Sequence, residues 1–191
     1  MEAWRAVRRE VRRMESTVRQ LLEIARREPR ERRRVSVRGL VRSAVASARS
    51  TLDEVGVDLD VDAGREPLEV LVDGARVEQA LGNLLRNAGQ ACPGERVRLV
   101  VEVEGRTAAF HVDDAGPGIP EADREAVFRP YFTTKAPGEG TGLGLALVQQ
   151  VAEEHAGSVS VTDGPLGGAR FTLRLPRDGE SAAAGEATVD G

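Results

Sequence analysis

Apolar and polar residues recur along the chain with two different periods, and these periods predict its helices and strands. Between residues 2 and 28, apolar side chains recur at intervals of three and four. This heptad pattern is typical of a helix in a coiled coil or bundle, although a helix folded back on its own domain is the alternative. Other helices are expected at 36–56, 74–92, just after Pro120, and 144–155. Alternation or short apolar runs predict strands at 57–62, 68–73, 96–105, 107–114, 157–164 and 167–176.

These elements predict an α+β fold in which a sheet is layered against helices, because they lack the regular alternation of a parallel βαβ sheet. Pro29 ends the first helix, so residues 1–34 are expected to form a helix and a charged linker. Residues 35–176 then form the globular domain. The tail at 177–191 is rich in Ala, Gly and Glu and is expected to be disordered, since it has little apolar surface to bury.

Composition narrows the possible class of protein and its cellular compartment. Hydrophobic residues make up 40% of the 191 residues, enough for a core, and no run of about 18 apolar residues predicts a transmembrane helix. The N-terminus also lacks the apolar stretch of a secretory signal. The single Cys92 excludes an internal disulfide, and the distant His111 and His155 add little to the case for a metal site. We therefore expect a cytoplasmic protein.

Charge is distributed unevenly along the chain. Residues 1–50 contain 15 Arg and six acidic residues, whereas the remainder contains 12 basic and 25 acidic residues. A basic arm can bind nucleic acid or an anionic membrane surface. Here the basic residues are interleaved with the heptad stripe, which favours a solvated helix face, and we do not expect a nucleic-acid partner.

Four glycines, Gly138, Gly140, Gly142 and Gly144, occur at every second position directly before the helix expected at 144. Backbone N–H groups in such a stretch can surround an anion, and the positive end of the helix favours a polyphosphate there. A flexible loop would have the same composition. The stretch is not a P-loop, because no GK[ST] ends it, and it does not follow directly on a strand as a Rossmann site would.

Two further stretches carry polar groups suited to a nucleotide. Asp114 ends a strand and precedes Gly116 and Gly118, so its carboxylate could accept a hydrogen bond from an exocyclic amine such as that of adenine; a capped tight turn is the alternative. Asn83 and Asn87 lie one turn apart on one face of the helix at 74–92. An Asn carbonyl oxygen can coordinate Mg²⁺, although an exposed polar face would have the same pattern.

Together these stretches resemble the ATP-binding domain of histidine kinases, within the superfamily of gyrase, heat-shock chaperone, kinase and MutL-type ATPases. NLLRNA resembles the N box, DDAGPGI the first glycine box, VFRPYFTTK the F box and GTGLGLALV the second glycine box. The QA after the N box and the TTK of the F box resemble the nitrogen-regulator subgroup. Over about residues 73–176, the resemblance implies a Bergerat-type two-layer α/β sandwich, with ATP between sheet and helices under a mobile lid.

The resemblance also implies roles for individual residues. Asn87 would be the Mg²⁺ ligand, Asn83 would support the phosphates and Asp114 would bind the adenine amine. Phe128 and Phe132 would pack beneath the lid. The ATP-binding residues it implies are Asn83, Asn87, Asp114, Gly116, Gly118, Thr134, Lys135, Gly138, Gly140, Thr141, Gly142, Leu143 and Gly144. Of these, Thr134 and Lys135 would reach the γ-phosphate, with an exposed end of the lid as the alternative.

The amide side chain of Asn83 helps to distinguish phosphoryl transfer from ATP hydrolysis. ATPase members of the superfamily have a Glu there that activates water, and an amide cannot take up a proton. The resemblance therefore implies transfer of the γ-phosphoryl group rather than rapid hydrolysis. A gyrase- or MutL-type ATPase whose basic helix contacts DNA, and a serine kinase acting on an anti-sigma antagonist, are the alternatives with the same fold.

No phosphoacceptor histidine is recognisable. The helix at 2–28 resembles the second helix of the dimerisation hairpin of histidine kinases, while His111 and His155 are expected to be structural. Three possibilities stay open: a fragment of a longer sensor kinase, half of a split kinase that acts in trans, or a non-catalytic nucleotide-binding module. The expected partners are an acceptor-histidine hairpin, a downstream response regulator and, through residues 2–28, a weakly bound second copy.

Overall fold

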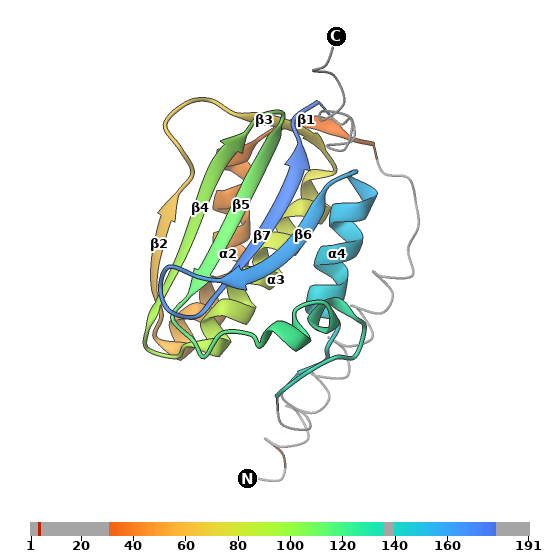
Figure 1. Cartoon of the computed structure of the whole chain (residues 1–191). Helices are drawn as coiled ribbons and strands as arrows, with labels where there is room; N and C mark the ends of the chain where they lie inside the picture. The colour runs from red at the N-terminus through yellow and green to blue at the C-terminus, as the bar shows by residue number, and fades with distance from the viewer. Residues whose placement is uncertain (1–3, 5–30, 136–139, 179–191) are drawn as a thin grey trace.

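A five-stranded mixed sheet faces a layer of helices in the computed structural model, which describes residues 4, 31–135 and 140–178 (Figure 1). In sheet order the strands are β2 (Asp58–Asp62), β4 (Arg96–Glu104), β5 (Thr107–Asp114), β7 (Ala169–Pro176) and β6 (Ser158–Asp163). Strands β2 and β4 are parallel, and the other three neighbouring pairs are antiparallel. A separate antiparallel pair consists of β1 (Arg33–Ser36) and β3 (Glu69–Val72).

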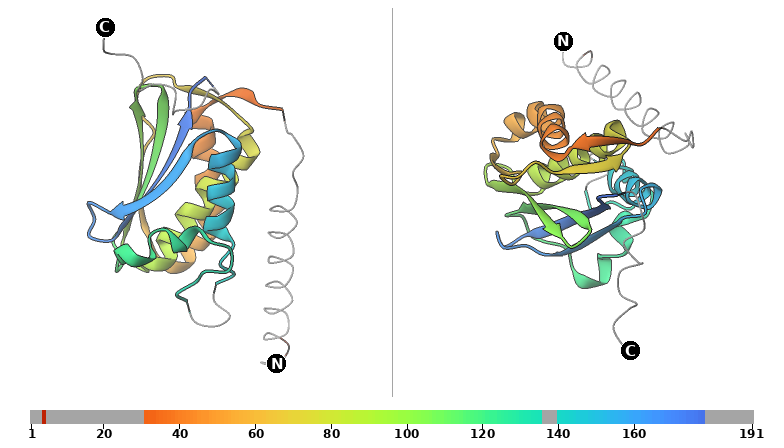
Figure 2. Two further views of the ribbon diagram at one scale, coloured as in Figure 1. Left: turned by 45° about the vertical axis from the view of Figure 1, so that its right-hand side comes forward. Right: turned by 90° about the horizontal axis from the view of Figure 1, so that it is seen from above.

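The helices α2 (Val37–Val55), α3 (Gly74–Ala91) and α4 (Gly144–Glu154) all lie on one side of the sheet (Figure 2). The central helix, α3, packs against both of the others. Two glycines of α3 let α2 approach closely, since a Cβ at Gly89 would lie 2.5 Å from Leu52 Cδ2 and one at Gly82 would lie 2.6 Å from Ser47 Oγ. This close packing against α2 determines which face of α3 is turned towards α4.

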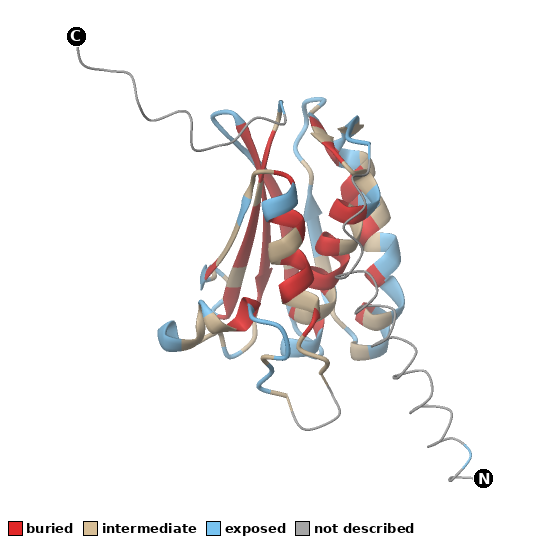
Figure 3. Cartoon of the chain, turned by 90° about the vertical axis from the view of Figure 1, so that its right-hand side faces the viewer, coloured by how far each residue is buried: buried red, intermediate tan, exposed pale blue. Residues whose placement is uncertain are grey.

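Strand β5 is buried on both faces, although helices cover only one of them. Ala108, Phe110 and Val112 belong to the hydrophobic core between sheet and helices (Figure 3). His111 and Asp113 alternate with them and point to the opposite, open face. There Thr172 and Arg170 of β7 cover them through side-chain hydrogen bonds.

Apart from the short helix expected after Pro120, the predicted strands and the predicted helices within the described residues are confirmed, with no boundary shifted by more than two residues. Two short 3₁₀ helices, Glu121–Asp123 and Ala126–Phe128, stand where one short helix is expected after Pro120. Strand β1 is not among the predicted elements. It lies at a sheet edge and is almost entirely exposed, so its sequence RRVS carries no apolar pattern.

The domain boundaries are only partly within the described residues. Strand β1 starts at Arg33, inside the expected linker, and Arg177 N donates to Arg106 O at 2.9 Å, so ordered structure extends past both boundaries of the expected globular domain. Of the helix expected at 2–28, only Trp4 is described; it is helical and exposed. The rest of that helix, and residues 179–191 of the tail, lie outside the described residues. No described helix is both long and apolar enough to cross a membrane.

Candidate functional site

The two asparagines of α3 lie against the first turn of α4. Asn83 is buried and Asn87 half-buried, and Asn83 Nδ2 donates to Gly144 O at 3.3 Å. A Cβ built on Gly144 would lie 4.0 Å from the Nδ2 atoms of both asparagines. The structure therefore brings together Asn83, Asn87 and Gly144, three of the predicted site residues, over 61 residues of sequence.

Among the described residues, the N-cap residue of α4, Leu143, gives the first turn no side-chain cap, although Thr141 Oγ1 lies 3.4 Å from Leu143 N. Uncapped N–H groups at a helix start carry partial positive charge and attract phosphate. Leu143 itself is buried, so its contribution to a ligand site is limited to the backbone.

Gly142, just before α4, is held close to the F box, and the end of the F box is attached to α3. Tyr131 N donates to Gly142 O at 2.9 Å, and Gly142 has a positive φ of 65°. Any side chain at Gly142 would collide with the Tyr131 backbone, 2.5 Å from the would-be Cβ. Lys135 Nζ donates to Gln90 Oε1 at the end of α3. Lys135 is thereby attached to the helix that carries the asparagines.

The remaining predicted residues of the segment from the F box to α4 have different surroundings from one another. A Cβ at Gly140 would lie 2.7 Å from Thr133 Oγ1, so the two arms of the segment lie against each other. Thr134 is exposed, and within the described residues no hydrogen bond joins it to the other site residues. Gly138 lies outside the described residues. Phe128 is buried edge-on against Phe171, with ring centroids 6.2 Å apart, and Phe132 packs on the core; their place beneath a lid stays a prediction.

A buried carboxylate marks the other end of the site. Asp114 ends β5 and is 2% exposed, and its Oδ1 accepts hydrogen bonds from Gly116 N at 2.9 Å and Ala169 N at 3.1 Å. Burial raises the pKa of Asp114, and these two hydrogen bonds counteract the rise only partly. In the described part of the chain, both hydrogen bonds fall on the same oxygen, so Oδ2 keeps its capacity to accept a bond from a ligand.

Sequence reasoning missed two residues that shape the site. A Cβ at Gly168 would lie 2.5 Å from Gly116 N and closer still to Asp114 Oδ1, so only glycine fits beside that carboxylate. Arg86 donates to Asn83 Oδ1, and burial lowers the pKa of this guanidinium. The available signals were the GG pair before the last strand and the position of Arg86 between the two asparagines.

Both histidines are buried within the fold, as expected of structural residues. His155 follows α4, and its Nδ1 lies 2.7 Å from Val151 O while its Nε2 accepts a hydrogen bond from Asp73 N at 3.0 Å. This pair of contacts requires the neutral ring with the proton on Nδ1. Burial lowers the pKa of His155 and favours the same form. The contact joins the end of α4 to Asp73, the N-cap of α3.

Comparisons with known proteins identify the same domain. The family profile described as "Histidine kinase-, DNA gyrase B-, and HSP90-like ATPase" matches residues 72–179. The sensor histidine kinase GtrS of Pseudomonas aeruginosa is 44% identical over 103 residues, which are 54% of this chain and 21% of GtrS. The sensor histidine kinase ZraS of Klebsiella oxytoca is 33% identical over 175 residues, 90% of this chain and 37% of ZraS. The chain thus spans well under half the length of these relatives.

Solved structures agree in fold. The catalytic domain of the histidine kinase ThkA, free of nucleotide, superposes with a TM-score of 0.71 at 28% identity, covering 78% of this chain and 98% of that domain. ThkA in complex with the response regulator protein TrrA gives a TM-score of 0.74 at 26% identity, covering 89% of this chain and 49% of that chain. The predicted α+β sandwich is therefore confirmed, while the likeness to the nitrogen-regulator subgroup stays a prediction.

Proposed function

Because the chain belongs to the family of histidine kinase-, DNA gyrase B- and HSP90-like ATPases, we propose that it binds MgATP and transfers the γ-phosphoryl group to a histidine outside this chain. One observation carries the proposal. The uncapped start of α4 adjoins Asn83 and Asn87 at one end of the site, and the buried Asp114 stands at the other. A purine triphosphate needs a hydrogen-bond acceptor for its amine and a positive, amide-lined site for its phosphates.

Asp114 would select adenine. A carboxylate only accepts hydrogen bonds, and the exocyclic amine of adenine only donates them. Gly116 N and Ala169 N hold the carboxylate through Oδ1, which leaves Oδ2 for the ligand. Guanine presents a carbonyl oxygen at the corresponding position and would face an unfavourable acceptor–acceptor pair. We expect ATP to be preferred over GTP for this reason.

The phosphates would lie at the start of α4, beside the asparagines. Asn87 is half-buried at this point and offers an amide oxygen, a ligand type that fits Mg²⁺. Bound there with the nucleotide, Mg²⁺ would neutralise phosphate charge. Arg86, held by Asn83 Oδ1, adds a cation next to the same helix face. Positioning and charge neutralisation are the main requirements of phosphoryl transfer.

Asn83 favours transfer over hydrolysis. Its Nδ2 donates to Gly144 O and its Oδ1 accepts from Arg86, so the amide is engaged at both atoms and cannot serve as a general base. Water near the phosphates would therefore be activated poorly, and the phosphoryl group would persist until an acceptor arrives. Two partners follow: an acceptor-histidine hairpin, and a response regulator of the kind that binds ThkA.

The test is a mixing assay with γ-³²P-labelled ATP. The full chain is incubated alone and then with an acceptor hairpin taken from a related sensor kinase, and labelled protein is followed on a gel. We expect acid-labile label on the hairpin and none on this chain. Failure to bind MgATP would overturn the whole proposal. Binding without transfer to any of several related hairpins would overturn the kinase activity and support a non-catalytic nucleotide-binding module.

The role of Asn87 is tested by calorimetry. Asn87→Ala should weaken MgATP binding by tenfold or more, a loss of about 1.4 kcal/mol, and should change the affinity for ATP in EDTA far less. Gln149→Ala on α4 is the control, since this amide bonds Glu153 one turn further along. Equal MgATP affinity for Asn87→Ala and the unaltered chain would exclude Asn87 as the metal ligand.

A further inference from the structure

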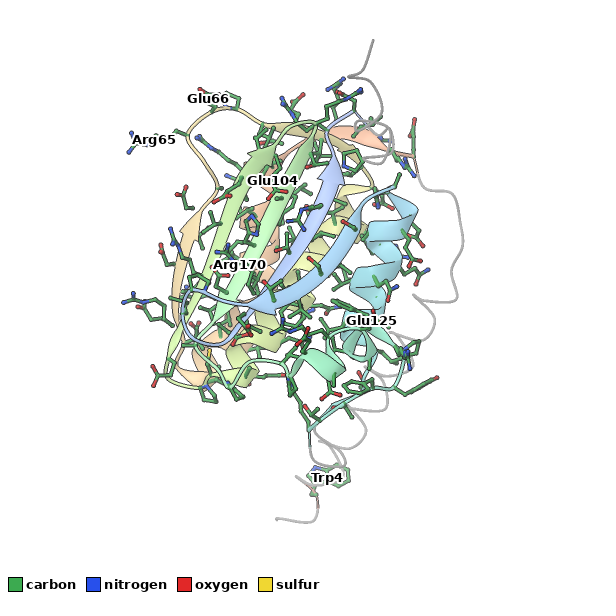
Figure 4. The ribbon with its side chains drawn as sticks, viewed as in Figure 1. Trp4, Arg65, Glu66, Glu104, Glu125 and Arg170 are labelled. Carbon is green, nitrogen blue, oxygen red and sulfur yellow. The ribbon has the colours of Figure 1, made fainter. Side chains whose placement is uncertain are left out.

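Three ligand-type side chains meet on the open face of the sheet, opposite to the nucleotide site. They are Glu102 and Glu104 of β4 and His111 of β5. Figure 4 views this face and labels Glu104 there. Glu102 and Glu104 are two residues apart on β4, so their side chains point to the same side of the sheet. Val100, two residues before Glu102 on β4, lies opposite His111 of β5, so His111 points to that side as well. One potential ligand atom from each of the three lies within 4.8 Å of the other two.

His111 is buried with one ring nitrogen unused. The side chain is 5% exposed, and Nδ1 lies 3.0 Å from Thr172 Oγ1. Nε2 has no hydrogen-bond partner within the described residues, although it is shielded from solvent. The nearest carboxylate oxygens, Glu102 Oε2 at 3.7 Å and Glu104 Oε1 at 3.8 Å, are too distant for a hydrogen bond. A buried polar atom without a partner is unfavourable unless a ligand completes it.

The charged groups around Nε2 comprise two carboxylates and two guanidinium groups. Burial and the nearby Arg170 and Arg174 lower the pKa of His111, against the opposing effect of the two carboxylates. If Nδ1 donates to Thr172, Nε2 presents a lone pair towards Glu102 and Glu104. Arg174 Nε donates to Glu104 Oε2 at 2.7 Å and lowers the pKa of that carboxyl group, leaving Oε1 turned towards His111.

We propose that Glu102, Glu104 and His111 form a binding site for a divalent transition-metal ion, with Zn²⁺ as the best-fitting ion and water as the remaining ligand. One imidazole and two carboxylates form a ligand set that Zn²⁺ accepts, whereas Mg²⁺ prefers oxygen ligands alone. At Zn–ligand distances of about 2.0–2.2 Å, tetrahedral ligand atoms lie about 3.3–3.6 Å apart. The observed 3.7 and 3.8 Å separations need only a small contraction.

The surroundings hold two of the three ligands in place before any ion binds. Thr172 fixes the plane of the His111 ring, and Arg174 fixes Glu104. Such hydrogen bonds orient metal ligands and tune their affinity. Glu102 is 59% exposed and would close the site on binding. A bound ion would connect β4 to β5 directly and so stabilise the sheet independently of ATP.

The experiment is a calorimetric titration of the full chain with ZnCl₂ in the absence of nucleotide. We expect one Zn²⁺ that Mg²⁺ in large excess does not displace. Glu102→Gln should weaken its binding at least tenfold, and because Glu102 is exposed this variant should fold normally. Glu66→Gln, on the loop between β2 and β3 (Figure 4) and outside the cluster of Glu102, Glu104 and His111, is the matched control and should bind as the unaltered chain does.

Two further measurements distinguish this site from weak binding of Zn²⁺ to scattered surface carboxylates and from binding at the nucleotide site. Co²⁺ should give visible absorption bands of a low-symmetry site in the unaltered chain and in Glu66→Gln, but not in Glu102→Gln or His111→Gln. ATP affinity should be the same for Glu102→Gln and the unaltered chain. Equal Zn²⁺ affinity for Glu102→Gln and Glu66→Gln, or no Zn²⁺ binding at all, would overturn the proposal.

Discussion

Two adjacent aspartates at the end of β5 point to opposite faces of the sheet, and their buried carboxylates have different hydrogen-bond partners. Asp113, on the open face, is fully buried and receives two bonds from Arg170, at 2.6 and 2.8 Å. Asp114, on the helix-covered face, receives only backbone N–H groups among the described residues, and only on Oδ1. Burial raises the pKa of Asp114, and no cation is among the groups that lower it.

The difference separates a carboxylate with both oxygens in an ion pair from one with Oδ2 open to a further hydrogen bond, as the proposed adenine contact of Asp114 requires. A bidentate ion pair uses both oxygens of Asp113, so that nothing is left for recognition. Asp114 keeps an acceptor in a buried position at the expense of stability, a compromise that is common at binding sites. Substitutions at and around the two residues should therefore separate ATP affinity from the stability of the fold.

The largest effect is expected for Gly168→Ala, which should disturb both properties. The added methyl group would displace Asp114 Oδ1 and Gly116 N, and such overpacking costs about 1–3 kcal/mol of unfolding free energy. ATP affinity should fall at least as far as in Asp114→Asn. Chemical denaturation and calorimetry measure the two effects. Gly39→Ala in α2, where the nearest atom to the new Cβ is 3.8 Å away, should instead be neutral or slightly stabilising.

Asp114→Asn should reduce ATP affinity by about 10–100-fold, equivalent to the about 1.5–3 kcal/mol of a hydrogen bond to a charged group. The Asn Oδ1 can still accept from Gly116 N and Ala169 N, so the fold should persist while an NH₂ group replaces the acceptor. The preference for ATP over GTP should fall with it. An unchanged preference would exclude Asp114 from adenine recognition.

Asp113→Asn should show the converse behaviour. Losing the charge of Asp113 leaves the Arg170 guanidinium with a weaker acceptor, and we expect the unfolding free energy to fall by about 1–3 kcal/mol. ATP affinity should stay within about twofold of the unaltered chain when both variants are compared by denaturation and calorimetry. A large loss of affinity in this variant would mean that the two faces of β5 are not independent.

The smallest effect is a difference in pH dependence. Because the folded pKa of Asp114 is raised, the folded state binds more protons than the unfolded state above the ordinary aspartate pKa. The unfolding free energy contributed by this group therefore falls as pH rises through that window. Asp114→Asn lacks this loss, so its stability relative to the unaltered chain should increase as the pH rises from the ordinary aspartate pKa of about 3.9 towards the raised pKa of the folded state. A constant difference across that range would contradict the assigned cause.

Local patterns in the sequence predicted what lies within one element. Asn83 and Asn87 share a helix face, and Asp114 ends an alternating strand, so both could be placed from a few neighbouring residues. Gly168 and Arg86 were marked in the sequence only by a GG pair and by a position between the two asparagines, because their importance arises from contacts that only the packed fold creates. Position 168 meets position 114 across 54 residues of sequence, and Arg86 matters through its bond to Asn83. The ligand-type cluster around His111 escaped notice for the same reason, since it needs the register of β4 against β5.

The hydrogen bond between Asp73 and His155 restricts where residues can be inserted or deleted in α3 and α4. It fastens the end of α4 to the start of α3, and the bond between Gly144 and Asn83 closes the other end of the antiparallel pair. Asn83 is ten positions after Asp73 and His155 is eleven positions after Gly144, so the two spans match at about 15 and about 16.5 Å. One inserted residue in either helix would shift the first turn of α4, at which we propose the phosphates bind, by about 1.5 Å and rotate it by about 100°. Over evolutionary time, insertions and deletions should therefore be eliminated from these two spans and accumulate in the loops outside them.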